Sequence, residues 1–247
     1  MGKISLTVSC GRYDRPVPIW DGRVSIEGCD VNVIPLDPEE VFFRALRYAE
    51  FDVAELSFNS YLMATSRGAC PYVALPAFVS RYFRHSAIYV RTGSGIEKPE
   101  DLKGREVGVP EYQMTASIWQ RGTLEHDFGV SQYDIHWFME RSEEFSHGGQ
   151  TGFQPPEGIS FSRIPEDESL ASMIVSNQLD AVSGMGAGSA NPDNVIDRSA
   201  RIRGSGDWSK VKRLFPDSIE ESIRFYRKYG FIPATQMFTI RRSTYDQ

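Results

Sequence analysis

Strand-like and helix-like segments alternate along almost the whole chain, and this alternation constrains the fold more than any other feature of the sequence. A strand–helix–strand alternation predicts an α/β fold, in which ligands bind beyond the carboxyl ends of the strands. A helix is expected over residues 111–126. Runs of apolar and β-branched residues predict strands at residues 3–9, 31–36, 52–56, 72–79, 86–91, 106–109, 135–139, 159–164, 179–183 and 237–242.

Capping signals mark where two of the helices begin. Asp37 and Glu40 fit a capping box, and Ser218 and Glu221 fit a second one near the end of the chain. The second helix carries apolar residues at helical spacing, which place them on one face of that helix. These residues are Ile219, Ile223 and Tyr226.

Two connectors divide the chain into lobes. Residues 92–103 and 184–206 are polar and rich in glycine, and we expect the chain to cross between lobes in both. Lobe 1 then consists of residues 1–91 and 207–247, and lobe 2 of residues 92–206. The predicted architecture is therefore two α/β lobes with a cleft between them and two crossing segments.

Charge and hydropathy narrow the class of ligand. The net charge is −6, which argues against a protein that binds nucleic acid or an anionic membrane through bulk charge. An anionic ligand would therefore need a local cluster of cations. The longest weakly polar run, residues 68–80, contains two prolines and is too short to cross a membrane.

The cysteines and the first residues favour a cytoplasmic protein. Three scattered cysteines suit a reducing compartment and do not have the spacing of a metal site. The apolar run at residues 4–10 continues into charged residues without the end typical of a signal peptide, so we interpret it as a strand. No histidine has metal-ligand spacing, and we expect no metal ion. Arginine residues in the loops and Trp208 could form a surface for self-association, so the sequence does not exclude a homo-oligomer.

The turn after the first strand contains Tyr13, Asp14 and Arg15. Arginine matches a carboxylate in a bidentate manner, so this turn is a candidate site for an aromatic acid. The alternative is a solvated turn with a local ion pair. Before a later strand, Arg84 and His85 form a second candidate pair, in which the histidine is either a general acid or a structural residue.

Two helix N-termini are candidate anion sites, because free N–H groups there favour negative charge. The first carries Ser57, Asn59 and Ser60, although N-capping alone also explains these residues. The equivalent turn in the second lobe allows the same two interpretations. Its candidate residues are Glu111, Tyr112, Gln113, Met114 and Thr115.

Several stretches together resemble the 4,5-dihydroxyphthalate decarboxylase family, over nearly the whole chain and in consistent order. These are Tyr13-Asp14-Arg15, Phe42-Phe43-Arg44, residues 50–55 with Ser57, Ser60 and Tyr61, Phe83-Arg84-His85-Ser86, residues 108–115 (GVPEYQMT) with Trp119, and residues 164–167. The resemblance implies a two-lobed fold of the type 2 periplasmic-binding-protein kind. It also implies removal of one ring carboxylate as CO2 without a cofactor, and further helices beyond the final strand that this chain does not contain.

Such a decarboxylation suggests roles for the candidate residues. Protonation of the ring carbon that bears the carboxylate needs carboxylate anchors, a general acid and an acceptor for the phenol proton. Arg15 and Arg84 are the expected anchors, His85 or Asp14 the acid, and Glu111 the acceptor.

Two positions depart from the resembled family. It carries an arginine where this chain has Gly186 and a histidine where this chain has Gln236. These departures leave open a monocarboxylate or a different aromatic acid as the ligand. Two functions are therefore carried forward: a decarboxylase of hydroxylated aromatic acids, and a non-catalytic binding protein for a small aromatic or carboxylate ligand.

Overall fold

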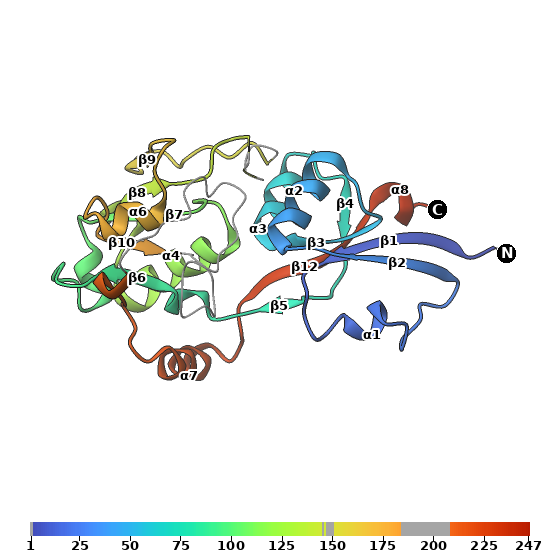
Figure 1. Cartoon of the computed structure of the whole chain (residues 1–247), viewed down its shortest axis with the longest axis horizontal. Helices are drawn as coiled ribbons and strands as arrows, with labels where there is room; N and C mark the ends of the chain where they lie inside the picture. The colour runs from blue at the N-terminus through green and yellow to red at the C-terminus, as the bar shows by residue number, and fades with distance from the viewer. Residues whose placement is uncertain (1, 145, 147–150, 184–207) are drawn as a thin grey trace. The chain divides into compact units, whose positions relative to one another are not determined.

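The computed structural model of the chain describes residues 2–144, 146, 151–183 and 208–247, which form two compact units (Figure 1). Unit 1 consists of Met1–Arg81, His147–Gly152 and Ala234–Gln247, and unit 2 of Tyr82–Ser146 and Phe153–Pro233. Each unit contains its own mixed sheet with helices, so the predicted two-lobed α/β architecture is confirmed.

Unit 1 is built on one sheet with the strand order β2-β1-β3-β12-β4, in which β5 also pairs with β12. Strands β1, β2 and β3 are parallel, whereas β12 runs antiparallel to β3. A core of apolar residues from α2 and β3 lies against this sheet. The elements are β1 (Ile4–Cys10), α1 (Val17–Trp20), β2 (Cys29–Pro35), α2 (Pro38–Tyr48), β3 (Val53–Ser57), α3 (Phe58–Ser66), β4 (Tyr72–Ala74), β5 (Ser80–Arg81), β12 (Ala234–Arg241) and α8 (Arg242–Tyr245).

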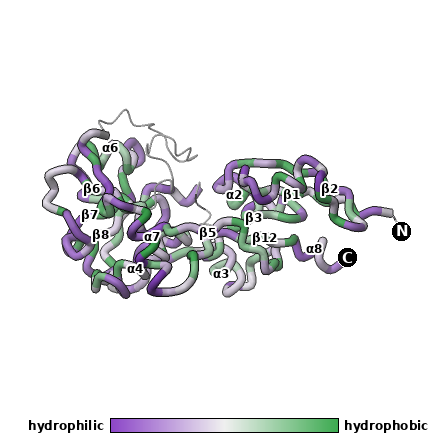
Figure 2. Tube along the Cα trace, turned by 90° about the horizontal axis from the view of Figure 1, so that it is seen from below, coloured by the Kyte–Doolittle hydropathy of each residue, from purple (hydrophilic) through white to green (hydrophobic). Residues whose placement is uncertain are grey.

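Unit 2 is built on a second sheet with the strand order β11-β6-β10-β7-β8-β9. Strands β10, β7, β8 and β9 are parallel, and β6 is antiparallel to β10. The elements are η1 (Arg84–Ser86), β6 (Ile88–Arg91), η2 (Pro99–Leu102), β7 (Glu106–Val109), α4 (Thr115–Phe128), η3 (Gln132–Asp134), β8 (His136–Met139), β9 (Phe161–Arg163), α6 (Leu170–Val175), β10 (Ala181–Ser183), η5 (Trp208–Lys210), β11 (Val211–Arg213) and α7 (Ser218–Tyr229). Figure 2 shows hydrophobic stretches along the strands of both units.

The predicted lobe boundaries need correction. Strand β6 pairs with both β10 and β11, so residues 82–91 and 208–233 belong to unit 2 and not to the first lobe. The predicted crossing at residues 92–103 lies wholly within unit 2 and contains η2. The other predicted crossing, residues 184–206, lies outside the described residues.

Local signals account for several element boundaries. Asp37 is the N-cap of α2, as predicted, and its carboxylate accepts a hydrogen bond from the amide of Glu39. The predicted strand over residues 72–79 is wrong in its extent: β4 ends at Ala74, because Pro76 cannot donate to a strand ladder. No helix in the described residues is long and apolar enough to cross a membrane.

Two predicted helix features differ. The N-cap of α7 is Asp217, whose carboxylate accepts from the amides of Ile219 and Glu220, so the prediction of Ser218 is wrong by one residue. The helix expected over residues 111–126 begins only at Thr115, because the preceding residues form a turn that the amide of Met114 closes on the carbonyl of Glu111.

Candidate functional site

One edge of the sheet in unit 1 gathers most of the polar residues predicted from the first half of the chain. The parallel strands β1 and β3 both end at this edge, in Cys10 and Ser57. Strand β12 runs the opposite way, so its first residues lie there too, and Gln236 is the register partner of Ser57 and of Ser80. The edge is the place where α/β sheets bind ligands.

At this edge, Tyr13 folds back onto the end of β3. Its hydroxyl donates a hydrogen bond of 2.9 Å to Oε1 of Glu55, and the amide of Gly11 donates one of 2.7 Å to Oε2. Both carboxylate oxygens are therefore bound, and the side chain of Glu55 is fixed. The close approach requires glycine at position 11, because a Cβ there would lie 2.7 Å from a ring carbon of Tyr13 and 2.8 Å from Pro38.

Glu55 is fully buried, and its two hydrogen-bond donors are both uncharged. Burial raises its pKa to about 7, although the hydrogen bonds from Gly11 and Tyr13 and the charge of Arg15 oppose the rise. Burial and the charge of Glu55 together raise the pKa of the Cys10 thiol to about 12, so this cysteine stays protonated. Glu55 is thus a carboxyl group that exchanges a proton near neutral pH.

Arg15 lies beside this pair. Its Cζ is 5.2 Å from the centre of the Tyr13 ring, and its Nε donates to the carbonyl of Val79 at 2.8 Å. The neighbouring Asp14 is 3.3 Å from an Arg15 nitrogen, and its side chain is 89% exposed. The structure therefore brings Tyr13, Asp14 and Arg15 together, as the turn predicted, and leaves a half-exposed guanidinium next to Glu55.

The N-terminus of α3 completes this edge. Ser57 is its N-cap residue, and Asn59 lies in its first turn. Ser60 is 1% exposed, and its Oγ has no hydrogen-bond partner among the described residues. On β12, Gln236 is 9% exposed, and its side-chain oxygen accepts a hydrogen bond of 3.1 Å from Thr235. A buried, unused hydroxyl at a helix N-terminus is suited to an anionic or hydroxylated ligand.

Unit 2 has an equivalent edge at the carboxyl end of β7. Glu111 is fully buried there and forms an ion pair of 2.7 Å with Arg141, which is 4% exposed. Ser146 donates to the second oxygen of Glu111 at 2.8 Å, and the Gln113 side chain donates to it as well. Glu111 is therefore enclosed in a buried network of hydrogen bonds, which differs from the exposed proton acceptor that its predicted role requires.

The remaining predicted residues of this turn divide between core and helix. Tyr112 is 2% exposed, and its ring lies under the Arg121 guanidinium at 3.7 Å and against Trp137, which makes it a core residue. Met114 is the N-cap residue of α4, and Thr115 begins that helix. Two residues further on, Ser117 is fully buried, and its Oγ has no partner in the described part of the chain.

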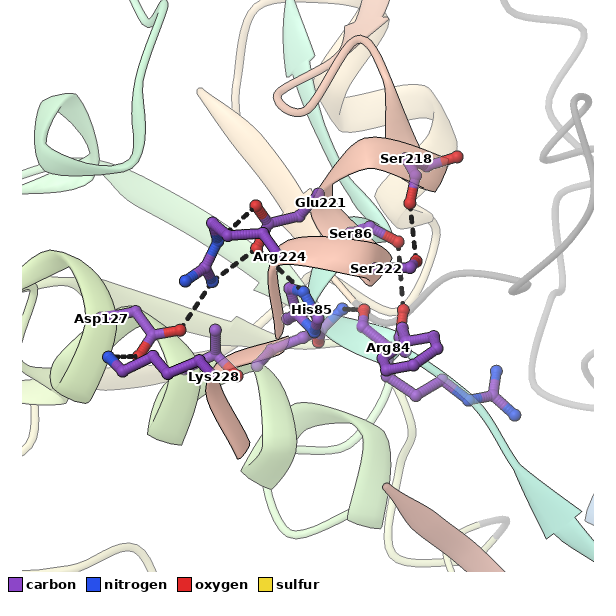
Figure 3. Close-up of polar contacts among 12 residues, drawn as sticks. Arg84, His85, Ser86, Asp127, Ser218, Glu221, Ser222, Arg224 and Lys228 are labelled. Atoms are coloured by element: carbon purple, nitrogen blue, oxygen red, sulfur yellow. Dashed lines mark hydrogen bonds and ion pairs between the residues drawn. The ribbon is translucent and has the colours of Figure 1, made fainter. Parts of the chain in front are cut away.

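His85 lies inside unit 2 (Figure 3). It is 1% exposed, its Nε2 lies 3.0 Å from Oε1 of Glu221, and its ring stacks on Phe225 at 4.9 Å. Burial opposes ionisation of Glu221, but its contacts with His85 and Arg224 lower its pKa below the ordinary value. His85 therefore joins η1 to α7.

The same network continues to α4. Arg224 and Lys228 both approach Asp127 at 2.6 Å, and the side chain of Asp127 is 1% exposed. Burial would raise the pKa of Asp127, yet the hydrogen bonds from Lys228, Tyr229 and Arg224 lower it to about 2. Figure 3 shows the guanidinium of Arg84 pointing away from this network.

Sequence reasoning assigned no role in a site to three charged residues that the structure places in buried polar contacts: Glu55, Arg141 and Glu221. A carboxylate at a buried position of the apolar strand VAELS was the available signal for Glu55. Arg141 lies in a loop and carries no local signal. Gly186 lies outside the described residues, and within the described ranges no group of three His, Cys, Asp or Glu side chains could hold a metal ion.

The comparisons with known proteins first define the class of fold, which is that of the periplasmic binding proteins. Residues 24–148 match a family model described as an ABC-transporter periplasmic substrate-binding protein for phosphonate. The periplasmic aliphatic sulphonate-binding protein SsuA of Escherichia coli has the same fold, with a TM-score of 0.54 and 12% identity over 99% of this chain and 67% of that one. SsuA of Xanthomonas axonopodis, bound to MOPS, gives a TM-score of 0.52 at 11% identity over 98% of this chain and 67% of that one.

Sequence similarity then gives the particular family. A 4,5-dihydroxyphthalate decarboxylase of Comamonas testosteroni is 38% identical over 247 residues, which are 100% of this chain and 71% of the relative. One from Pseudomonas putida is 44% identical over 184 residues, 74% of this chain and 71% of the relative. The chain therefore has a periplasmic-binding-protein-like fold and belongs to the 4,5-dihydroxyphthalate decarboxylase family.

Proposed function

We infer that this chain is a carboxy-lyase that removes CO2 from a hydroxylated aromatic acid. The named relatives support this function, and one observation in the structure supports it most directly: the Tyr13–Glu55 pair beside Arg15. A guanidinium, a phenol and a proton-exchanging carboxyl group lie together at the ligand-binding edge of a sheet. These are the groups that an aromatic hydroxy acid requires.

We propose that the reaction proceeds by protonation of the ring carbon that bears the carboxylate, without a cofactor. Direct loss of CO2 would leave an electron pair in an sp² orbital that the π system cannot stabilise. When the ring carbon is first protonated, the C–CO2 bond breaks and its electron pair restores the aromatic ring. Removal of a proton from a ring hydroxyl supplies electron density for the first step.

Glu55 acts as the proton acceptor, through Tyr13. A substrate hydroxyl passes its proton to Tyr13, and the Tyr13 proton moves along the 2.9 Å hydrogen bond to Glu55. The transfer leaves Glu55 neutral and Tyr13 unchanged, so protons balance. Because the pKa of Glu55 is about 7, the carboxylate can accept and return a proton at neutral pH.

Arg15 anchors the substrate carboxylate, since its side chain is 58% exposed and its Nε is fixed on Val79. Of the two predicted acids, Asp14 is the accessible one, whereas His85 is enclosed and contacts Glu221. We therefore assign Asp14, which is open to solvent, as the group through which a solvent proton reaches the ring carbon, and His85 as a positioning residue. Glu111 is assigned a structural role on the same grounds.

The ligand is a small aromatic carboxylate, and 4,5-dihydroxyphthalate is the first candidate because the relatives are named for it. Gln236 departs from the histidine that the resemblance implies, and the hydroxyl of Thr235 holds its side-chain oxygen. We propose that this neutral amide widens acceptance toward monocarboxylates. A cytoplasmic location and self-association remain proposals as well.

The experiment is to incubate the chain with 4,5-dihydroxyphthalate and with related hydroxylated mono- and dicarboxylic aromatic acids, and to measure CO2 and ring product. Turnover of at least one acid, lost in Tyr13→Phe and Arg15→Met, is expected. Binding in a thermal-shift assay without turnover of any acid would establish the alternative function, a non-catalytic binding protein. Addition of EDTA should leave turnover unchanged if no metal ion takes part.

A further inference from the structure

Helix α7 turns an apolar face to solvent. Ile219 is 72% exposed, Ile223 44% and Tyr226 51%. Their spacing of i, i+4 and i+7 places them on one stripe of the helix, as in the seam of a coiled coil. The sequence pattern predicted correctly that these residues share one face of the helix. The buried residues of α7 are Glu221 and Phe225, on a different face.

The inner face of α7 is firmly attached to unit 2. Glu221 contacts His85, and Arg224 and Lys228 both bind Asp127 of α4 (Figure 3). Phe225 is 3% exposed and stacks on His85. Because these contacts fix the helix from one side, the exposed stripe is a preformed surface and not part of a frayed segment.

One acidic and one basic residue lie beside the apolar stripe, at opposite ends of α7. Glu220 and Arg227 lie two turns apart on the same flank of the apolar stripe, and both are exposed. Within the described residues, neither forms an ion pair with another side chain. The acidic residue lies near the N-terminal end of α7 and the basic residue near its C-terminal end.

We propose that this face of α7 is the contact between two copies of this chain, with the two α7 helices packed antiparallel about a two-fold axis near Ile223. In an antiparallel helix pair, like flanks meet across the seam. Glu220 of each copy then faces Arg227 of the other, and the contact occurs twice. A parallel pair would bring Glu220 and Arg227 against the opposite flank, where serines stand, and would leave both charges without partners.

A second copy fits this surface better than a different partner does, because the surface complements itself. Apolar residues meet apolar residues along the stripe, and opposite charges meet at both ends. An isologous contact of this kind closes at two copies and leaves no free seam. The inference concerns α7 alone and does not depend on the reaction proposed above.

Sedimentation velocity of the full chain, from about 1 to 200 µM, tests the proposal. A concentration-dependent dimer is expected. Glu220→Arg and Arg227→Glu should each raise its dissociation constant by about tenfold or more, since each places like charges together twice. The double variant E220R/R227E should restore the dissociation constant to within about threefold, because the attraction is exchanged and not lost.

Ile223→Glu should abolish the dimer, and Val24→Glu, at a residue in unit 1 that is 52% exposed, is the matched control that should leave it intact. Circular dichroism checks that each variant is folded. If Ile223→Glu does not fold, the charge-reversal variants alone test whether α7 forms the dimer contact. A monomer at every concentration overturns the proposal. So does a dimer that the single reversals do not weaken, or one that the double reversal fails to restore.

Discussion

The hydroxyl of Tyr13 donates a 2.9 Å hydrogen bond to the carboxylate of Glu55 and so joins the loop after β1 to the middle of strand β3. Glu55 is fully buried, and both of its donors are uncharged. Burial raises the pKa of Glu55, and the two hydrogen bonds lower it. Burial is the larger effect, so the pKa is raised to about 7. This relationship makes the site sensitive to pH in the neutral range.

Glu55→Gln is expected to remove this sensitivity. In the unmodified protein, kcat/KM should rise as pH increases through about 7, because the carboxylate form accepts the phenol proton. The variant should be about 100-fold slower or more and should lack that rise. Glu50→Gln is a suitable control, since Glu50 pairs with Arg44 and not with Tyr13. An unchanged pH profile in Glu55→Gln would exclude the assigned role.

The same carboxyl group should shape the pH dependence of stability. Its pKa rises from 4.5 to about 7 on folding, so the folded state holds more protons between these values. The stabilisation is complete below about pH 4.5 and is lost as pH rises to about 7. At about 1.4 kcal/mol per pH unit, the loss amounts to about 3 kcal/mol.

Urea unfolding at pH 5 and pH 8 measures this loss, and Glu55→Gln should reduce the difference between the two pH values. Asp127 acts in the opposite direction, because its pKa is lowered to about 2 and its contribution is lost only in acid. Equal stability of the unmodified protein at pH 5 and pH 8 would contradict the assignment to Glu55.

The features that the sequence predicted correctly are those with local causes. Asp37 caps α2 because its carboxylate reaches an amide two residues away, and β7 has the bounds that its apolar run indicates. Tyr13 and Arg15 come together because they share one turn. In each case, the residues that make the feature are close neighbours in the chain.

The failures have long-range causes. Glu55 acquires its properties only when Gly11 and Tyr13 fold against it, 44 and 42 residues away in sequence. Helical periodicity shows that α7 has an apolar stripe, but it cannot show which face of the helix packs against unit 2. The face that packs there carries Phe225 and the charged residues bound to His85 and Asp127. Hydrophobic pattern alone cannot anticipate that choice.

Gly11→Ala should disturb the site without removing any functional group. The added Cβ would lie 2.7 Å from the Tyr13 ring and must displace either that ring or the nearby Pro38. Displacement of the ring breaks the hydrogen bond to Glu55, so activity should fall about as far as in Tyr13→Phe. Gly122→Ala is the control for a glycine without such a contact, since a Cβ at Gly122 meets nothing within 4 Å and its backbone is not in the left-handed region. A fully active Gly11→Ala protein would show that the close contact is dispensable.

The buried ion pair of Glu111 and Arg141 should contribute to stability and not to chemistry. Arg141→Met leaves the Glu111 carboxylate buried with Ser146 and Gln113 as its neutral donors, and it should cost about 3 to 5 kcal/mol. Chemical denaturation measures the cost. Arg23→Met is the control, because Arg23 is 65% exposed and pairs with the exposed Asp21 at 2.8 Å, so its replacement should cost less than about 1 kcal/mol. A loss of turnover in folded Arg141→Met, with stability unchanged, would assign the pair to catalysis instead.

His85→Gln distinguishes the enclosed histidine from a catalytic acid. Glutamine can keep a donor near Glu221 but cannot stack on Phe225 as the imidazole does, so the melting temperature should fall by several degrees while turnover persists. His85→Ala should destabilise further, because it leaves the Glu221 carboxylate, 9% exposed, with Arg224 as its remaining partner. Thermal unfolding and kcat are measured on the same samples below the melting transition. If His85→Gln is as stable as the unmodified protein yet binds substrate without turning it over, His85 is the acid and Asp14 is not.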